Sequence, residues 1–207
     1  LPDGLNAAVL ALGEAFGSRV EVFGGSWLTV GKADGIARSG DPVANRKGQQ
    51  LLGVPDNLDS LPTRAREFDV LITVGHDLWA ANADKAKALE VIPVRIALAS
   101  WQDSTVAKAT IAVGIRAWAE VRGTMVNCQG RVQVMNACPV VANGDLEPAW
   151  QVLARLASYA GKPIPWSSEL DAWKACVERV PAFAGLSYRS IGPMGAMITS
   201  EQPVGAA

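Results

Sequence analysis

The chain has 207 residues, of which 49% are hydrophobic and 19% are charged, and 19 Lys and Arg residues against 20 Asp and Glu residues leave a net charge of -1. This balance offers no basic surface for nucleic acid or anionic lipid, so we expect neither as a partner. Three cysteines and one histidine exclude a disulfide framework and a multi-histidine metal site, and we expect no bound metal.

The length suits one domain that can bury a core without disulfide or metal staples. No stretch reaches the roughly 20 apolar residues that a membrane-spanning helix needs, so we expect a cytosolic chain without direct membrane insertion. The chain begins with Leu1 instead of Met, which suggests a processed protein or a piece of a longer one.

The N-terminal part is predicted to combine one helix, one short strand and a long irregular segment. Apolar residues recur every three or four positions from 5 to 16, which indicates an amphipathic helix with Asp3 available as its cap. Residues 19–25, with two valines and a phenylalanine, predict a short strand. Residues 26–62 are rich in Gly, Asp, Asn and Pro, so we expect connecting structure with a short helix near 46–52 and a lining or docking role.

The central region is predicted to alternate buried strands with helices. Residues 68–75 form an unbroken apolar run with several β-branched side chains, which is typical of a strand buried on both faces of a parallel sheet. The elements that follow are expected to be a helix at 83–91, a strand at 91–100, a short helix within 102–109 and a strand at 110–115. This order predicts βαβ crossovers, and therefore an α/β fold built on an open, doubly wound, Rossmann-like parallel sheet flanked by helices.

The C-terminal part has a different character. We expect an appended hairpin at 123–135 and C-terminal helices at 145–161 and 167–180. From 181 to 207 the chain is rich in Gly and Pro and poor in charge, which predicts an extended or disordered tail. The predicted organisation is a single α/β domain over 1–180 followed by this tail.

Open α/β sheets bind ligands beyond the carboxyl ends of their strands, which directs attention to Gly75, His76 and Asp77 after the first buried strand. One interpretation makes these residues contacts to a nucleotide-like group. The other makes them a turn in which Asp77 caps the next helix. We favour the turn, because the tripeptide has little specificity and no GxGxxG or P-loop motif is present. We assign no catalytic residue.

A second polar group near the expected hairpin, formed by Glu120, Arg122, Asn127 and Arg131, also allows two interpretations. Glu120 could serve as an acid or base, with the arginines as anion clamps. We favour the alternative, in which Glu120 pairs with Arg131 or Arg122 and pins the hairpin to the sheet, because no second carboxylate or histidine lies close by.

Seven tryptophans are many for this length. Trp150 and Trp173 fall on helical apolar stripes and are expected in the core. Trp27 lies in a glycine-rich segment and could instead face a partner.

The segment from 107 to 157 resembles the molybdopterin oxidoreductase superfamily. Seven residues match a pattern of that superfamily in order and spacing: Glu120, Gly123, Thr124, Asn127, Gly130, Arg131 and Gln133. Trp150 matches an element that opens a helix there. Residues 45–57 are also similar to a stretch of the G subunit of bacterial NADH-quinone oxidoreductase, respiratory complex I, so the resemblance extends from 45 to 160.

The chain departs from the catalytic members of that superfamily at two strand ends. Asp77-Leu78 replaces their Asn-Pro, and Val113-Gly114 replaces a leucine-proline pair. The resemblance therefore implies a domain that retains the fold but holds no pterin or other cofactor. Iron–sulfur clusters are then expected elsewhere in the parent subunit.

For function, the resemblance implies a scaffold without a redox centre in the peripheral arm of NADH:quinone oxidoreductase, the NADH dehydrogenase of the respiratory electron-transport chain. Its partners would be other subunits of that arm, with Trp27 and Trp166 as candidate anchors. It would lie in the cytoplasm, on the inner face of the plasma membrane.

Two alternatives remain open at this point. The first is a fragment of a catalytic, formate dehydrogenase-like molybdopterin oxidoreductase, in which Gly75, His76 and Asp77 contact the pterin dinucleotide. The second and weaker one is an independent module that binds a small nucleotide.

Overall fold

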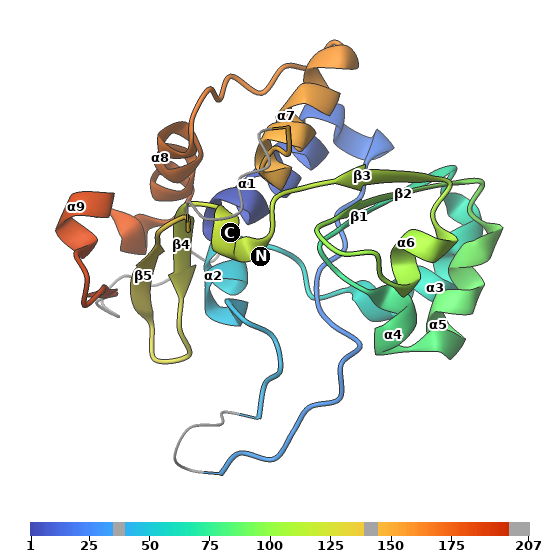
Figure 1. The fold of residues 1–207 in the computed structure, drawn as a ribbon, viewed down its shortest axis with the longest axis horizontal. Helices are drawn as coiled ribbons and strands as arrows, with labels where there is room; N and C mark the ends of the chain where they lie inside the picture. The colour runs from blue at the N-terminus through green and yellow to red at the C-terminus, as the bar shows by residue number, and fades with distance from the viewer. Residues whose placement is uncertain (35–39, 139–144, 199–207) are drawn as a thin grey trace.

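The computed structural model describes residues 1–34, 40–138 and 145–198. A parallel sheet and an antiparallel sheet lie on opposite sides of a central group of helices (Figure 1). The predicted α/β class, with its parallel sheet flanked by helices, its appended hairpin and its C-terminal helices, is therefore confirmed.

Three strands form the parallel sheet in the order β1-β2-β3: β1 (Val70–Val74), β2 (Val94–Ala99) and β3 (Ile111–Gly114). Both pairs are parallel, so the three carboxyl ends lie at one edge. Valine, isoleucine and alanine dominate these strands, as is typical of parallel sheets, but β3, at the edge of the sheet, is mostly exposed.

Short helices connect these strands and cover one face of the sheet. The connections are α4 (Leu78–Ala81), α5 (Ala83–Lys87), a 3₁₀ turn (Ala88–Val91) and α6 (Ser104–Lys108), and α3 (Leu61–Arg64) precedes β1. The helix expected at 83–91 thus tightens into 3₁₀ geometry in its second half. The buried core on this side, called here the outer core, comprises Trp27, Leu58, Leu61, Ala65, Leu78, Ala86, Leu89 and Ile92.

The opposite face of the parallel sheet packs against α1 (Asp3–Phe16) and α7 (Ala149–Tyr159). This core comprises Leu5, Ala8, Leu98, Ile115, Ala149, Trp150 and Leu153. α1 also contacts α8 (Glu169–Arg179), and it contributes Ala7 and Leu10 to a separate core with the antiparallel sheet. One helix therefore belongs to the cores of both sheets.

The antiparallel sheet has the order β4-β5-β6: β4 (Gly123–Val126), β5 (Arg131–Met135) and β6 (Ala196–Met197). β4 and β5 form the predicted hairpin, which is confirmed. In its turn the Asn127 side-chain oxygen accepts hydrogen bonds from the backbone N–H groups of Gln129 and Arg131, and Gly130 has a φ of 83°. The predicted short helix is confirmed as α2 (Arg46–Leu52), which packs against β4.

The strand predicted at 19–25 is wrong. The segment begins with a 3₁₀ turn (Gly17–Arg19) and continues without regular structure. Phe23 packs edge-on against Phe68 with ring centroids 5.5 Å apart, and the Arg64 guanidinium lies over both rings. No described strand lies beside the segment. This packing and hydrogen bonds between Gly24 and Asn57 hold it instead.

Part of the predicted tail is also folded. A 3₁₀ turn (Pro181–Phe183) and α9 (Tyr188–Ile191) follow α8, and β6 then pairs with β5. Phe183 is fully buried, with its ring centroid 5.2 Å from that of Trp173 in α8. The apolar residues of this segment thus complete a core that the rest of the chain begins.

The last residues of the predicted tail, 199–207, lie outside the described residues. The division of the chain into a domain over 1–180 and a tail stays a prediction. Among the described residues, no helix combines the length and the apolar character needed to cross a bilayer.

Replacing Phe183 with alanine is expected to lower the free energy of unfolding by about 3 to 5 kcal/mol, because the deleted ring leaves a cavity in a packed core. Urea denaturation followed by circular dichroism measures the change. Tyr159→Ala is the control, since Tyr159 is 84% exposed on α7 and its loss should change stability by no more than about 0.5 kcal/mol. Equal effects of the two substitutions would contradict the packing of this segment.

Candidate functional site

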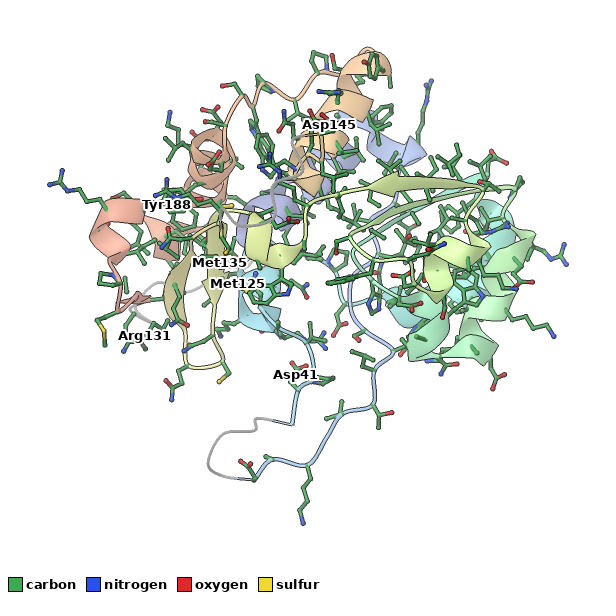
Figure 2. The ribbon with its side chains drawn as sticks, in the orientation of Figure 1. Asp41, Met125, Arg131, Met135, Asp145 and Tyr188 are labelled. Atoms are coloured by element: carbon green, nitrogen blue, oxygen red, sulfur yellow. The ribbon has the colours of Figure 1, made fainter. Side chains whose placement is uncertain are left out.

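A cleft of about 570 Å³ opens at the carboxyl edge of the parallel sheet, where the sequence predicts a ligand site. Its lining includes the residues that follow the three strands: Gly75, Ser100, Ile115 and Arg116. The antiparallel half of the molecule contributes Met125 from β4 and Tyr188 from the first position of α9 (Figure 2). The cleft therefore forms between the two halves of the fold.

Three tryptophans contribute to the cleft, and two of them face solvent. Trp101, in the loop after β2, is 73% exposed, and Trp118, in a 3₁₀ turn (Trp118–Glu120) after β3, is 70% exposed. Trp150, near the beginning of α7, is buried. Exposed tryptophans leave a large apolar area in contact with water, so two beside one cleft indicate a binding surface.

Two arginines border the cleft in defined positions. Arg116 Nε donates to the backbone carbonyl of Leu146 at 2.8 Å, and the Arg122 guanidinium lies 4.7 Å from the centroid of the Tyr188 ring. Within the described part of the chain, neither arginine forms an ion pair. Glu169, the first residue of α8, is the acidic side chain among the described lining residues. The lining thus carries an excess of positive charge.

Asp77 lies at the same sheet edge, and its carboxylate accepts four hydrogen bonds. The donors are the backbone N–H groups of Ala80 in α4 at 3.1 Å and of Ser104 and Thr105 in α6 at 3.2 and 3.1 Å. The Thr105 hydroxyl adds a fourth bond at 3.0 Å. Burial opposes the charged form, but these bonds outweigh it and lower the pKa of Asp77. The interpretation of Asp77 as a helix cap is confirmed.

Further N–H groups at the beginnings of α4 and α6 are also bonded to side chains of the protein. The Leu78 N–H donates to the Thr105 hydroxyl at 2.8 Å, and the Val106 N–H donates to the Asp103 carboxylate at 2.8 Å. In nucleotide-binding α/β proteins, comparable N–H groups bind a phosphate of the ligand. Here the carboxylates of Asp77 and Asp103 accept hydrogen bonds from such N–H groups instead.

Gly75 and His76, the other two residues of the predicted site, differ in their surroundings. Gly75 has a φ of 58° and lines the cleft, a conformation that glycine adopts without strain. His76 is half-buried, and its buried Nε2 atom has no hydrogen-bond partner among the described residues. Burial lowers the pKa of His76, against the opposite effects of Asp77 and Asp103, so its imidazole is neutral at pH 7. A ligand contact by these residues stays a prediction.

The polar group expected near the hairpin is dispersed. Glu120 Oε2 accepts a hydrogen bond from the backbone N–H of Ala117 at 2.8 Å. In the described structure it forms no ion pair with Arg122 or Arg131. Arg131 Nη1 instead lies within hydrogen-bond distance of two backbone carbonyls just before β6. The favoured pairing of Glu120 with an arginine is therefore wrong, because the carboxylate caps its own 3₁₀ turn.

The residues that carry the family resemblance lie on and beside the hairpin. They run from the 3₁₀ turn through β4 and its turn to β5: Glu120, Gly123, Thr124, Asn127, Gly130, Arg131 and Gln133. Asn127 and Gly130 form the turn, and Gln133 is exposed. Thr124 is buried, and its hydroxyl donates to the carboxylate of Asp3 at 2.8 Å. The motif therefore serves the fold at Thr124 as well as at the turn.

Asp3, Asn45 and Thr124 form a buried polar group, called here the Asp3 cluster, next to the cleft. Asp3 is 0% exposed, and its carboxylate accepts hydrogen bonds at 2.8 Å from Asn45 Nδ2 and from the Thr124 hydroxyl. Asn45 Oδ1 accepts the backbone N–H of Val126 in β4 at 2.6 Å. The expected role of Asp3 as a helix cap is wrong, because Pro2 precedes α1 and Asp3 lies inside its first turn.

The buried position of Asp3 disfavours the ionised form of its carboxyl group. Burial raises the pKa of Asp3 from 3.8 to about 6, although the hydrogen bonds from Asn45 and Thr124 act to lower it. The hydrogen bonds therefore offset the loss of hydration only in part. The Asp3 cluster was missed by sequence reasoning, because it joins positions 42 and 121 residues apart.

Gly48 of α2 approaches the Asp3 cluster so closely that no side chain fits. A Cβ atom at this position would lie 2.2 Å from Asp3 Oδ1 and 2.3 Å from Asn45 Oδ1. Asn45 itself has a φ of 60°, a left-handed conformation that asparagine tolerates better than most residues. Asn45 and Gly48 both lie in the stretch, 45–57, that is similar to the G subunit.

Asp3→Asn is expected to remove one contribution to the pH dependence of stability. Because the pKa of Asp3 is raised in the folded state, protonated Asp3 adds to the unfolding free energy of the unchanged protein. This contribution is complete below pH 3.8 and is lost as pH rises through about 6. Stability of the variant relative to the unchanged protein should therefore rise by up to about 3 kcal/mol over this range. Urea denaturation from pH 3 to 7.5 measures the difference, and a difference independent of pH would contradict the assignment.

Gly48→Ala is expected to lower the unfolding free energy by about 2 to 4 kcal/mol, because the new methyl group separates Asp3 from Asn45. Gly31→Ala provides the comparison, since a Cβ there would meet its nearest atom at 3.6 Å and the φ of Gly31 is negative. The same denaturation assay measures both variants. If Gly48→Ala lowered the unfolding free energy no more than Gly31→Ala does, the Asp3 cluster would accommodate the new methyl group without cost, and the prediction would be wrong.

The exposed tryptophans differ from those expected. Trp27 is buried in the outer core, so its interpretation as a surface anchor is wrong, and Trp166 is half-buried against two cores. Trp101 and Trp118 are the exposed ones among the described residues. Both follow strands of the parallel sheet closely, and that position is the sequence signal that could have identified them.

Groups able to bind metal do not converge in the described residues, where no three His, Cys, Asp or Glu side chains lie close enough to hold an ion. Cys128 and Cys138 are exposed and Cys176 is buried, and all three are free thiols. Burial is the main cause that raises the pKa of the Cys176 thiol, so it stays protonated.

Comparison with known proteins gives relatives of two kinds. No family model matches the chain. It is 29% identical over 124 residues to the F420-dependent formate dehydrogenase 2 subunit alpha of Methanococcus maripaludis, a match that covers 58% of this chain and 18% of the relative. It is 31% identical over 127 residues to the G subunit of NADH-quinone oxidoreductase from Shewanella oneidensis, covering 58% and 14%. Formate dehydrogenase H of Escherichia coli is 23% identical over 167 residues, covering 75% and 23%.

Each of these matches spans less than a quarter of the relative. These matches confirm the resemblance that was predicted from the sequence. That resemblance is to a region like that of the NADH-quinone oxidoreductase G subunit, within the molybdopterin oxidoreductases. The relatives are thus oxidoreductase subunits that include formate dehydrogenases.

Proposed function

We propose that this chain is a structural region, without a redox centre, of a protein like the G subunit of NADH-quinone oxidoreductase. In this role it positions other subunits in the peripheral arm of respiratory complex I, in the cytoplasm at the inner face of the plasma membrane. Iron–sulfur clusters would belong to other parts of the parent subunit. The similarity to the G subunit supports the assignment to this complex.

The observation that carries the structural role is the set of hydrogen bonds around Asp77. The resemblance to molybdopterin oxidoreductases implies a pterin dinucleotide, whose phosphates need N–H donors at the edge of the sheet. The residues present do not fit this group, because Asp77 already accepts from the N–H groups of Ala80, Ser104 and Thr105. A phosphate in that place would also meet carboxylate charges, which repel a like charge 4 Å away by about 4 kcal/mol near a protein surface.

The alternative function is a fragment of a formate dehydrogenase-like enzyme that contributes to pterin dinucleotide binding. Two observations favour it: the similarity to two formate dehydrogenases and the position of the cleft at the carboxyl edge of the sheet. Under this alternative, Gly75, His76 and Asp77 contact the cofactor.

Titration calorimetry of the 207-residue chain with GDP, a probe for the nucleotide half of the dinucleotide, separates the two functions. We expect a dissociation constant weaker than about 1 mM, because the N–H donors at the sheet edge are already occupied. Metal analysis and mass spectrometry of acid-released nucleotides on the same sample should find no stoichiometric molybdenum or pterin. Tighter GDP binding, or bound pterin, would refute the structural role and favour the enzyme fragment.

An Asp77→Ser variant makes the same test sharper. Serine keeps an oxygen that can cap α4 but removes the negative charge of the Asp77 carboxylate from the sheet edge. We expect this variant to bind GDP more tightly than the unchanged protein. Identical, immeasurably weak binding by both proteins would show that Asp77 is not the group that excludes phosphate.

A further inference from the structure

We propose that the cleft at the carboxyl edge of the parallel sheet is a docking site for an extended segment of a partner protein that carries alternating acidic and apolar side chains. This inference rests on the proposed function, because it gives the cleft a protein ligand in place of a cofactor. It assigns the contact to Trp101, Trp118, Arg116 and Arg122.

The apolar part of the site lies on the segments that leave two neighbouring strands. Trp101 and Trp118 follow β2 and β3, and both expose more than two thirds of their surface beside the cleft. Burying these indoles on a partner removes a large apolar area from water. Tryptophan and arginine are also the residue types that contribute most to binding energy at protein interfaces.

The charged part of the site selects an acidic partner. Arg116 is oriented by its bond to the Leu146 carbonyl, and Arg122 is oriented by the ring of Tyr188. No described carboxylate pairs with either guanidinium. Among the side chains of the described lining, two arginines against the carboxylate of Glu169 give an excess of one positive charge. A partner carboxylate can bind either guanidinium through two parallel hydrogen bonds.

The occupied backbone N–H groups at the sheet edge favour a peptide over a nucleotide. The cleft volume of about 570 Å³ accommodates a few side chains, while the backbone of a bound segment crosses the opening. Backbone N–H groups of the kind that bind a nucleotide phosphate follow β1 and β2, and here they are bonded to Asp77 and Asp103. A side-chain carboxylate can bind the guanidinium groups of Arg116 and Arg122, which line the cleft and have no described carboxylate partner.

The test uses a capped hexapeptide, Leu-Asp-Leu-Glu-Leu-Asp, titrated into the 207-residue chain while tryptophan fluorescence and heat are recorded. We expect saturable binding that shifts the fluorescence and weakens with added salt. Trp118→Ala and the double variant Arg116→Gln/Arg122→Gln should each weaken binding by about tenfold or more. The uncharged peptide Leu-Asn-Leu-Gln-Leu-Asn should bind the unchanged protein no better than the acidic peptide binds the double variant.

Two matched controls isolate the cleft. Tyr159→Ala removes an exposed aromatic side chain from α7, outside the cleft lining. Arg66→Gln/Lys87→Gln removes two positive charges from exposed positions that also lie outside the lining. Both control proteins should bind the acidic peptide as the unchanged protein does, and circular dichroism of all variants checks that they are folded.

The outcomes distinguish this inference from the proposed function. Absence of saturable peptide binding, or equal weakening by the cleft and control variants, overturns the inference alone. Equal binding of the neutral and acidic peptides also overturns it, because charge would then have no part in recognition. GDP that binds the cleft and displaces the peptide refutes the proposed structural role as well.

Discussion

The carboxylate of Asp3 is fully buried and accepts hydrogen bonds from Asn45 and Thr124. These bonds join three parts of the chain: the first turn of α1, the residue before α2, and strand β4. A buried carboxylate without these donors would be far more costly than the exposed one in the unfolded chain. The cluster thereby fixes the beginning of α1, which packs on both sheets. The geometry of the cleft between the two halves follows from this placement.

The elements that were predicted correctly from the sequence are determined mainly by local residues. The apolar run of β1 and the Asn127–Gly130 turn need little from distant residues to adopt their conformation. The segment from 19 to 25 has the composition of a strand but lacks a strand to pair with, and Phe183 belongs to a core built mainly by other segments. Both outcomes depend on tertiary neighbours, which composition and periodicity do not reveal.

One part of the candidate site could likewise be predicted from the sequence, and another part could not. Its location at the carboxyl edge of the sheet could be predicted, because that edge follows from the order of strands and helices. Its wall from the antiparallel half could not, since Met125 and Tyr188 belong to elements that tertiary packing, including that of α1 and α8 on β4, brings to the cleft. In nucleotide-binding α/β proteins the N–H groups at this edge bind phosphate, whereas here those of Ser104 and Thr105 donate to the carboxylate of Asp77.

Sharing of α1 between two cores also affects how the protein can change over time. A substitution on one side of this helix alters the support of the other side, because both apolar faces belong to one rigid element. The two sheets are therefore not exchangeable modules, and recombination at the boundary between them would leave each with an uncovered apolar surface prone to aggregation. Variation is tolerated best in the exposed positions of the connecting segments, away from the helix that holds the halves together.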